Sequence, residues 1–358
     1  GTANRSAGLG GKAMKRVLAS GLGLVALGLL GAAYYFLATY APAAIDPDWR
    51  VDGVEGADAV PEGAVSVRYT GTSTLLFSDG ETHWMIDGWF TRVGPLALAM
   101  GEIEPDLAAI DYGLAMNEVD RLSVVIPVHS HFDHAMDAPE VARRTGAILL
   151  GSASTANIAR GWELPESQIR LANNREAVQF GKFTITLIET RHFQFPDPAV
   201  AERALANPRI EAPLVPPVKA FDYRLGKAYA VHVAHPLGSW LIQGSAGFVE
   251  GGLEGYPADI VFLGTGGLGT QTAEYRESYW RETVEVSGAT RIVPIHWDSL
   301  TGPIRGPFTG PVRAAGFLGG GSEQTLAFLR GKAQGNPALR FEVLPRYAPV
   351  VLFEASPR

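Results

Sequence analysis

Three histidines and an aspartate occur within six residues of this chain, and this cluster restricts the possible folds more than any other feature. The stretch "VHSHFDHAMDAP" (Val128–Pro139) directly follows the apolar run "LSVVIPV" (Leu122–Val128), which suits a strand buried on both faces. The 358-residue chain has only eight histidines. A solvated loop has no need of three of them, and a buried core could not easily satisfy so many imidazoles. The fold must therefore supply a common partner for these side chains at a strand end.

The spacing of the cluster indicates a metal site. On a tight turn after a strand, the alternate residues His129 and His131 converge on one point, and Asp133 and His134 on a second point nearby. Imidazole and carboxylate together suit zinc and other first-row metals, whereas Mg²⁺ and Ca²⁺ prefer oxygen ligands alone. The chain has no cysteine, which excludes disulfides and thiolate ligands.

Two further histidines also follow predicted strands. His192 comes directly after "FTITLIETR", and His296 directly after "RIVPI". Open-edged α/β folds place their ligand sites at strand ends, so we expect both to join the cluster. His83 lies inside a predicted strand and is interpreted as structural or exposed. His232 and His235 lie near a long insertion and are candidates for contact with substrate.

The N-terminal region predicts a membrane segment. Residues 1–16 form a tag-like, basic flank, and residues 17–40 belong to a stretch without charge that runs from Arg16 to Asp46. A bilayer span needs about 20 apolar residues, which favours an uncleaved anchor, although "TYAPAA" also suits the cleavage site of a signal segment. The basic flank predicts that the rest of the chain lies on the periplasmic side of the membrane, or is secreted if the segment is cleaved.

The remainder, residues 64–358, predicts one layered α/β domain. Short β-rich runs dominate at first, and strands then alternate with helices, a pattern that a mixed sheet accommodates. An insertion at about 193–235 is rich in proline and aliphatic residues, and two interpretations stay open: a lid or binding surface, and a surface excursion packed on itself. The net charge of −7, without a long basic run after the N-terminus, indicates no nucleic-acid partner.

The chain resembles the metallo-β-lactamase superfamily of hydrolases over about Val65 to Phe353. The resemblance rests on "HSHFDH", on the isolated His192 and on the late "PIHWD". It implies a four-layer αβ/βα sandwich with one or two zinc ions, or manganese or iron, in a groove at one edge. The first ion would be held by His129, His131 and His192, and the second by Asp133, His134 and His296.

Within the superfamily, "YTGTSTLLF", "HWMIDGWF" and "HWD" are most similar to the branch of lactonases and phospholipase-D-like phosphodiesterases. There, Asp87 would brace the metal ligands from beneath. Trp297 joins His235 as a candidate for contact with substrate. Ser245, in "QGSAGF", stands where most members have an aspartate that bridges both metals. This departure resembles one subclass of true β-lactamases, and it also allows a weak or empty second site. Asp259 is a candidate substitute.

The resemblance implies metal-assisted hydrolysis of a small-molecule or lipid-like substrate. Water activated by the metals would attack an ester, lactone or β-lactam carbonyl, while Asp133 orients the water and takes up its proton. Two other interpretations stay open: a phosphodiesterase acting on a lipid-derived substrate, and a metal-binding module without catalysis. No G-x-S-x-G motif for a serine nucleophile is present. The sequence makes no prediction of oligomeric state.

Overall fold

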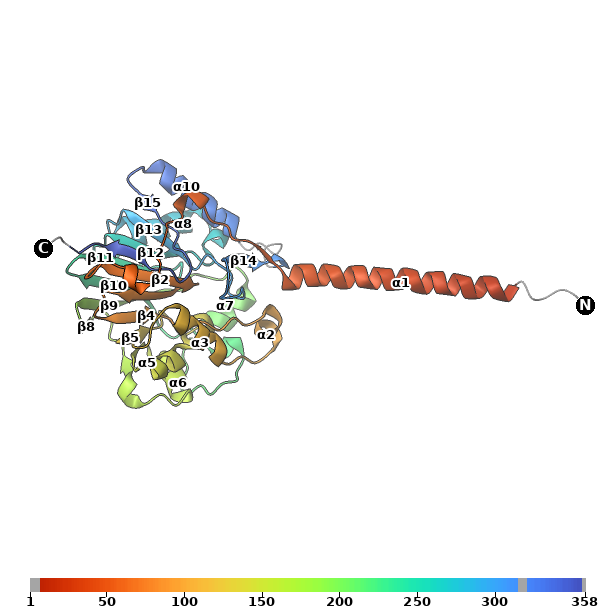
Figure 1. Ribbon diagram of the computed structural model, residues 1–358, viewed down its shortest axis with the longest axis horizontal. Coiled ribbons are helices and arrows are strands. Elements are labelled where there is room, and N and C mark those ends of the chain that lie inside the picture. Colours follow the sequence, from red (N-terminus) through yellow and green to blue (C-terminus); the bar gives the residue numbers. More distant parts are fainter. Residues whose placement is uncertain (1–6, 315–320, 356–358) are drawn as a thin grey trace, which may run out of the picture.

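Two seven-stranded sheets face each other in the computed structural model, which describes residues 7–314 and 321–355 (Figure 1). The first sheet has the order β16-β2-β3-β4-β5-β6-β7, and the second β15-β13-β12-β11-β10-β9-β8. The strands of the first sheet are β2 (Val65–Gly71), β3 (Thr74–Ser78), β4 (His83–Ile86), β5 (Val124–Ile126), β6 (Ile148–Gly151), β7 (Ile169–Leu171) and β16 (Val350–Phe353). Those of the second are β8 (Ala177–Phe180), β9 (Phe183–Thr190), β10 (Ala228–His235), β11 (Gly238–Gln243), β12 (Ile260–Gly264), β13 (Arg291–Ile295) and β15 (Arg340–Phe341).

Helices cover the outer face of each sheet, so the domain has four layers. Among the described residues, the domain has the α-helices α2 (Pro95–Met100), α3 (Leu107–Met116), α4 (Phe132–Ala135), α5 (Ala138–Thr145), α6 (Ala153–Gly161), α7 (Pro198–Leu205), α8 (Ala273–Trp280) and α10 (Ser322–Gly335). Short 3-10 turns are η1 (Pro47–Trp49), η2 (Ala57–Ala59), η3 (Glu166–Gln168), η4 (Ala220–Asp222) and η5 (Leu268–Thr270), and a π-helical turn, η6 (Arg281–Glu285), continues α8. The predicted αβ/βα sandwich is thereby confirmed.

Alternation along the strands produces these layers. In β3, Leu75 and Phe77 belong to the core between the sheets, whereas Leu76 packs outward with residues of α3, α5 and α6. In the second sheet, Leu241 of β11 packs outward against α8 and α10. Successive side chains of a strand point to opposite faces, so a strand in this position must be apolar on both. Phe77 stacks on Trp84 at 4.6 Å between ring centroids.

Parallel and antiparallel pairing coexist in both sheets, as the order of the predicted elements indicated. β4, β5, β6 and β7 run parallel, and so do β11, β12, β13 and β15, while the remaining neighbours are antiparallel. Loops that follow the parallel strands therefore emerge at one common edge of each sheet. The two sheets bring these edges together, and this edge carries the histidine cluster.

The predicted insertion ends earlier than expected. The stretch without strands runs from 191 to 227 and contains α7 and η4, whereas residues 228–235 form β10 in the middle of the second sheet. The alternation of "YAVHVAH" (Tyr229–His235) was itself a strand signal. Asp197 caps α7 by accepting from the amides of Ala199 and Val200, as its position before Pro198 indicates.

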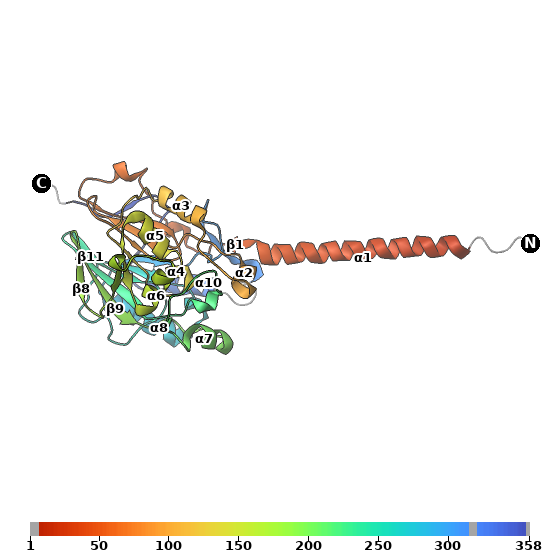
Figure 2. The ribbon, with the colours of Figure 1, turned by 90° about the horizontal axis from the view of Figure 1, so that it is seen from below.

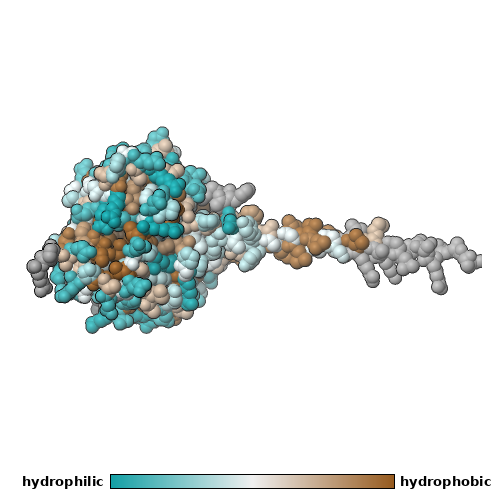
Figure 3. All heavy atoms as spheres, turned by 45° about the horizontal axis from the view of Figure 1, so that its top comes forward, coloured by the Kyte–Doolittle hydropathy of each residue, from teal (hydrophilic) through white to brown (hydrophobic). Residues whose placement is uncertain are grey.

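An N-terminal helix, α1 (Ala7–Ala38), projects away from the domain (Figures 1 and 2). Its segment Ala19–Ala38 is long and apolar enough to cross a membrane, by length and composition, and none of it is buried against the rest of the chain. Figure 3 shows this apolar rod beside a domain whose visible surface is largely hydrophilic. Directly after α1, β1 (Tyr40–Pro42) pairs with β14 (Thr309–Val312) in a small separate sheet.

Candidate metal centre

Four strand ends supply the side chains of the centre. β5 leads through Val128 into the loop that holds His129 and His131, and α4 then presents Asp133 and His134. β9 ends two residues before His192, and β13 ends one residue before His296. Because β4 and β5 are parallel neighbours, Asp87 at the end of β4 lies beside the same loop. Sequence positions 87 to 296 thus meet at one edge of the sandwich.

All six predicted ligands come together, in the two groups of three that the resemblance implies. The potential ligand atoms of His129, His131 and His192 lie within 4.8 Å of one another. In this group, His129 Nε2 and His131 Nδ1 are 3.1 Å apart. Two ring nitrogens that face each other at this distance can both reach a cation with bonds of about 2.0–2.1 Å.

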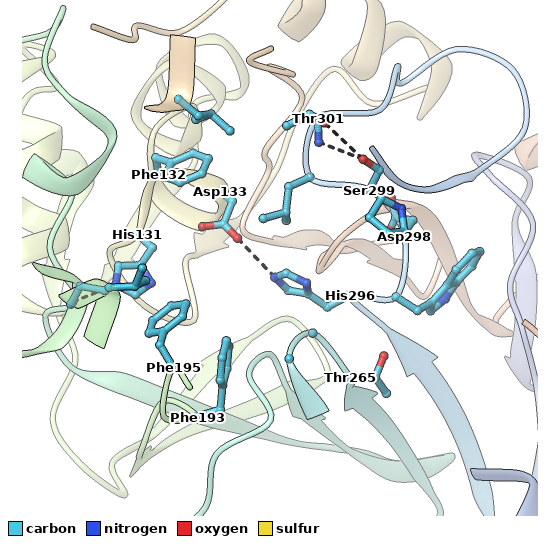
Figure 4. Close-up of a pocket in the computed structure, with 18 of the residues that line it drawn as sticks. His131, Phe132, Asp133, Phe193, Phe195, Thr265, His296, Asp298, Ser299 and Thr301 are labelled. Atoms are coloured by element: carbon cyan, nitrogen blue, oxygen red, sulfur yellow. Dashed lines mark hydrogen bonds and ion pairs between the residues drawn. The ribbon is translucent and has the colours of Figure 1, made fainter. Parts of the chain in front are cut away.

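The second group contains Asp133, His134 and His296 and meets the same 4.8 Å limit. Asp133 Oδ2 lies 3.3 Å from His296 Nε2 and 3.4 Å from His134 Nε2. Figure 4 shows Asp133 and His296 facing each other across the cavity, with His131 on the other side of the carboxylate. The rings of His129 and His134 are 3.9 Å apart between centroids, so the two groups are adjacent.

In two imidazoles of the first group, a hydrogen bond to the outer ring nitrogen fixes which nitrogen is free. His192 Nδ1 lies 2.8 Å from the carbonyl oxygen of Phe193, and His131 Nε2 lies 3.3 Å from that of Ala204. A carbonyl only accepts, so these nitrogens carry the protons and the opposite nitrogens keep their lone pairs. The free nitrogens, His192 Nε2 and His131 Nδ1, are available to a metal.

Asp87 braces the centre from below, as the resemblance implied. Its fully buried carboxylate accepts from His134 Nδ1 at 2.7 Å and from the Val128 amide at 2.9 Å. Asp87 has a φ of 60°, a left-handed conformation in which aspartate and asparagine are more common than most residues. This turn directs the carboxylate toward His134 and leaves His134 Nε2 free on the side of Asp133.

Burial and neighbouring charges set the two groups apart. Burial, reinforced by the surrounding imidazoles, lowers the pKa of His129 and of His192 well below the ordinary value, and burial lowers the pKa of His131 to about 4. These three rings are neutral at pH 7. In the second group burial acts in the same direction, but the carboxylates of Asp133 and Asp87 outweigh it and raise the pKa of His134.

The donor set fits a first-row metal ion. Three neutral imidazoles form one group, and two imidazoles with a carboxylate form the other. Zinc, iron and manganese sites combine these two types of ligand. Burial raises the pKa of Asp133, but the adjacent His134 and His296 outweigh it, so its pKa is lowered and it stays an ionised ligand. So many carboxylates and unprotonated rings buried close together are costly unless they bind a cation or pair with one another.

A second layer of polar contacts holds His296, and sequence reasoning missed it. His296 has a φ of 58°, and its amide donates to the carbonyl oxygen of Thr72 at 2.6 Å. The buried Asp298 accepts from the Thr72 amide at 2.7 Å and from the Tyr69 hydroxyl at 3.0 Å. The letters "YTGT" and "HWD" contain these residues, but their spacing along the chain does not show that they touch.

Asp137 completes the support on the other side of the loop and was not singled out either. Its carboxylate accepts from the amides of Phe90 and Thr91 at 2.8 and 2.7 Å, and from the Thr91 hydroxyl at 2.8 Å. Burial, despite these hydrogen bonds, raises the pKa of Asp137 to about 6. It ties the loop of the metal centre to the chain that follows Asp87.

Three candidates from the sequence lie elsewhere. His232 lies in the middle of β10, where its Nε2 faces the Pro257 carbonyl oxygen and its ring packs on Tyr256. His235 ends β10, whereas the start of that strand pairs with Thr190 near the centre. Seven residues of strand, at about 3.3 Å each, separate His235 from that edge. There its ring packs on Phe183 and faces Asp79, at the opposite end of the strand from the metal centre. Asp259 precedes β12 and accepts from the Ser239 amide, at the wrong end of the strand to replace a bridging aspartate.

Ser245 and Trp297 do lie at the right edge. Ser245 follows β11, and its hydroxyl accepts from the Phe193 amide at 3.3 Å. Its role at the bridging position stays a prediction. The indole of Trp297 donates to the Pro294 carbonyl oxygen at 3.1 Å, and the ring borders the cavity above the centre. Its contact with substrate likewise stays a prediction.

The cavity next to the centre has a volume of about 450 Å³ and mostly apolar walls. His131, Asp133, His192 and His296 form its polar floor. Aromatic and aliphatic side chains form the rest, including Leu98, Phe132, Phe193, Phe195, Val200, Phe221, Tyr223, Trp297, Leu300 and Val312. Figure 4 shows Phe193 and Phe195 beside His131. No lysine or arginine lines the cavity within residues 7–314 and 321–355.

Comparisons with known proteins agree with this architecture. No family model matches the chain. A UPF0173 metal-dependent hydrolase of Thermus thermophilus is 29% identical over 85 residues, which is 24% of this chain and 30% of the relative's length. Igni18, a metallo hydrolase from Ignicoccus hospitalis, superimposes with a TM-score of 0.50 at 18% identity, covering 82% of this chain and all of that one.

The chain has the metallo-β-lactamase fold. A further similar structure is YhfI from Bacillus subtilis, a metallo-β-lactamase fold protein, with a TM-score of 0.42 and 14% identity over 79% of this chain and 97% of YhfI. In the metallo-β-lactamase fold of the present chain, the edge shared by the two sheets holds the six-residue centre described above.

We expect Asp87→Asn to lower the affinity of the second group for zinc by about 10- to 100-fold, because the charge that orients His134 is lost while the left-handed turn is kept. Competition with a chromophoric chelator measures this affinity. Asp259→Asn, which removes a carboxylate at the opposite sheet edge, is the matched control and should change nothing. Equal affinities for wild type and Asp87→Asn would contradict the bracing role.

Acidification should release the second ion before the first. The lowered pKa values of His129, His131 and His192 leave no proton to displace between pH 8 and about 5. The raised pKa of His134 means that protons compete with a metal there at higher pH. Metal content per chain is measured after dialysis at a series of decreasing pH values. His192→Ala, which keeps the second group intact, should begin to lose metal at a higher pH than His296→Ala, which keeps the first group intact. The reverse order would show that the electrostatic assignment is wrong.

Proposed function

We propose that this protein is a metal-dependent hydrolase. One observation carries the proposal: six imidazole and carboxylate ligands from three separate chain segments converge, and four of the six line one apolar cavity. The UPF0173 relative is named a metal-dependent hydrolase, and Igni18, whose fold this chain shares, is named a metallo hydrolase. The chain covers 30% of the length of the UPF0173 relatives, so their activity supports the proposal without deciding it.

The residues of the centre divide the chemical work. Zinc bound there would lower the pKa of water from 15.7 to about 7 and polarise the bond under attack. The rings of His131, His192 and His296 line the cavity floor and set where a reacting group lies. Asp133 also faces the cavity and, with a lowered pKa, stays ionised, so it accepts a hydrogen bond from the attacking water and orients it.

A neutral carbonyl compound is the substrate class that we propose, namely an ester or a lactone, with a β-lactam next. The cavity walls are aromatic and aliphatic, and its charged lining comes from the metal centre and Asp298. Anionic substrates are commonly held by arginine or lysine, and none of the described residues lining the cavity is either. A phosphodiesterase acting on a lipid-derived substrate is the second candidate, because α1 and the apolar walls favour a lipid.

We propose in addition that α1 anchors the protein in a membrane, with the basic flank in the cytoplasm and the domain on the periplasmic side. Ala19–Ala38 extends over about 30 Å as a helix, which equals the hydrocarbon thickness of a bilayer. Lys15 and Arg16 precede this span, as the positive-inside rule requires of a cytoplasmic end.

An assay panel tests the proposed hydrolase. Zinc-loaded protein should hydrolyse p-nitrophenyl esters or a homoserine lactone faster than nitrocefin and bis-p-nitrophenyl phosphate. The double variant His129→Ala, His131→Ala should lose at least about 100-fold in kcat/KM, because the first group then retains only one imidazole. His232→Ala, which removes a ring that contacts the Pro257 carbonyl oxygen, is the control. If no substrate reacted while both metals bound, the protein would be a metal-binding module instead.

A further inference from the structure

The junction between α1 and the domain is short and pinned by specific contacts. Only Thr39 separates the last residue of α1 from β1, and in the β1–β14 pair Tyr40 lies opposite Val312. Arg313 donates from its amide to the Thr39 carbonyl oxygen at 3.0 Å and from Nε to the Thr39 hydroxyl at 3.2 Å. The helix is therefore joined to the domain without a flexible linker.

The contacts that pin α1 belong to the wall of the metal cavity. The Tyr40 hydroxyl donates to the Thr301 carbonyl oxygen at 2.6 Å, and Thr301 lines the cavity. Val312, the partner of Tyr40 in the small sheet, also lines it. Ala44, six residues after the end of α1, is a further wall residue. Six residues span at most about 21 Å, so the cavity lies close to the end of the helix.

Aromatic residues at this junction indicate that it lies at the interface between membrane and water. Tyr34, Tyr35 and Phe36 lie near the end of the apolar segment, and Tyr40 follows four residues after Phe36. Tyrosine side chains concentrate where a membrane meets water, because the ring is apolar and the hydroxyl is polar. The guanidinium of Arg313 lies 4.7 Å from the Tyr35 ring centroid, which places a cation from the domain at the same level.

A second apolar element lies at the same end of the domain. Figures 1 and 2 both show α2 where α1 leaves the globule. In α2, Leu98 lines the cavity, whereas Leu96 and Met100 point outward with 70% and 74% of their surfaces exposed. These two are four residues apart and share one helix face. An exposed apolar pair beside a membrane segment needs a partner, and the bilayer that holds α1 is within reach.

We propose that the α2 face formed by Leu96 and Met100 inserts into the membrane that holds α1, so that the metal cavity opens toward the bilayer and receives a substrate with an acyl or alkyl chain from it. The inference rests on the proposed hydrolase and on the anchoring by α1, and it names their common substrate class. The cavity offers the acyl or alkyl chain of such a substrate an apolar wall next to the polar floor, formed by Phe193, Phe195, Val200 and Leu300. The hydrolysable carbonyl then lies at His131 and Asp133, with the chain directed to the membrane side.

The chain has no cysteine, so a single introduced cysteine allows a direct test in this chain with α1 in place. Leu96→Cys is labelled with an environment-sensitive fluorophore and reconstituted into phosphatidylcholine–phosphatidylglycerol vesicles. Doxyl-labelled lipids should quench this label, and aqueous iodide should not. Lys182→Cys, in the turn between β8 and β9 at the far end of β9 from His192, is the control and should show the opposite behaviour. Iodide quenching of the Leu96 label, without quenching by doxyl lipid, would overturn the proposal.

A chain-length series tests the substrate class in the same vesicles. For p-nitrophenyl esters, each added methylene should raise kcat/KM by up to about fourfold until the cavity is filled. The double variant Leu96→Asp, Met100→Asp should lower the rate for a long-chain ester by about tenfold or more, with a much smaller effect on the acetate. Leu171→Asp replaces an exposed leucine beside the Arg170–Glu176 ion pair and should change neither rate.

The two experiments separate the possible failures. Equal rates for short and long esters would overturn the acyl-chain class while leaving the hydrolase in place. If neither acetate nor long esters reacted, the proposed hydrolase would fail, and lipid quenching at Leu96 would still decide the orientation of the cavity. A long-chain preference that survives Leu96→Asp, Met100→Asp would contradict delivery through the α2 face.

Discussion

The hydrogen bonds of one buried carboxylate hold the centre together. Asp87 joins the end of β4 to the metal loop through the Val128 amide and to the second group through His134 Nδ1. Burial raises the pKa of Asp87 despite His134, so the charged form is kept only at a cost. A cation bound at His134 Nε2 offsets that cost, because its positive charge acts on the Asp87 carboxylate through the ring that Asp87 orients. Stability of the loop and affinity for metal are therefore coupled through one side chain.

Two further buried carboxylates hold the loops around the ligands. Asp298 accepts two hydrogen bonds and Asp137 accepts three, from amides and hydroxyls in the loops on either side of the ligands, and these bonds restrain His296 and the turn after β4. Both carboxylates are buried, and their donors come from segments distant in sequence. The six ligands are thus held on rigid strand ends, which is what a site needs to keep its geometry during a reaction.

Sequence reasoning succeeded where the signal was local. The His129–His134 spacing, and the positions of His192 and His296 after strands, were sufficient because parallel strands end at a common edge. The same reasoning left His235 and Asp259 open as candidates, since a histidine or aspartate near a strand does not reveal which end of the strand it occupies until the strand direction is known. Tyr69, Thr72 and Asp298 were missed because their contacts join residues more than 200 positions apart. The link from Tyr40 to Thr301 was invisible for the same reason.

The central claim is that two cations share this edge of the sandwich, and an anomalous difference map of zinc-loaded crystals tests it most directly. The account predicts one peak within about 2.0–2.2 Å of nitrogens from His129, His131 and His192, and a second at the same range from Asp133, His134 and His296. Ser245 should lie outside this bonding range of both peaks. Peaks at other histidines, or none at this edge, would contradict the assignment of the centre.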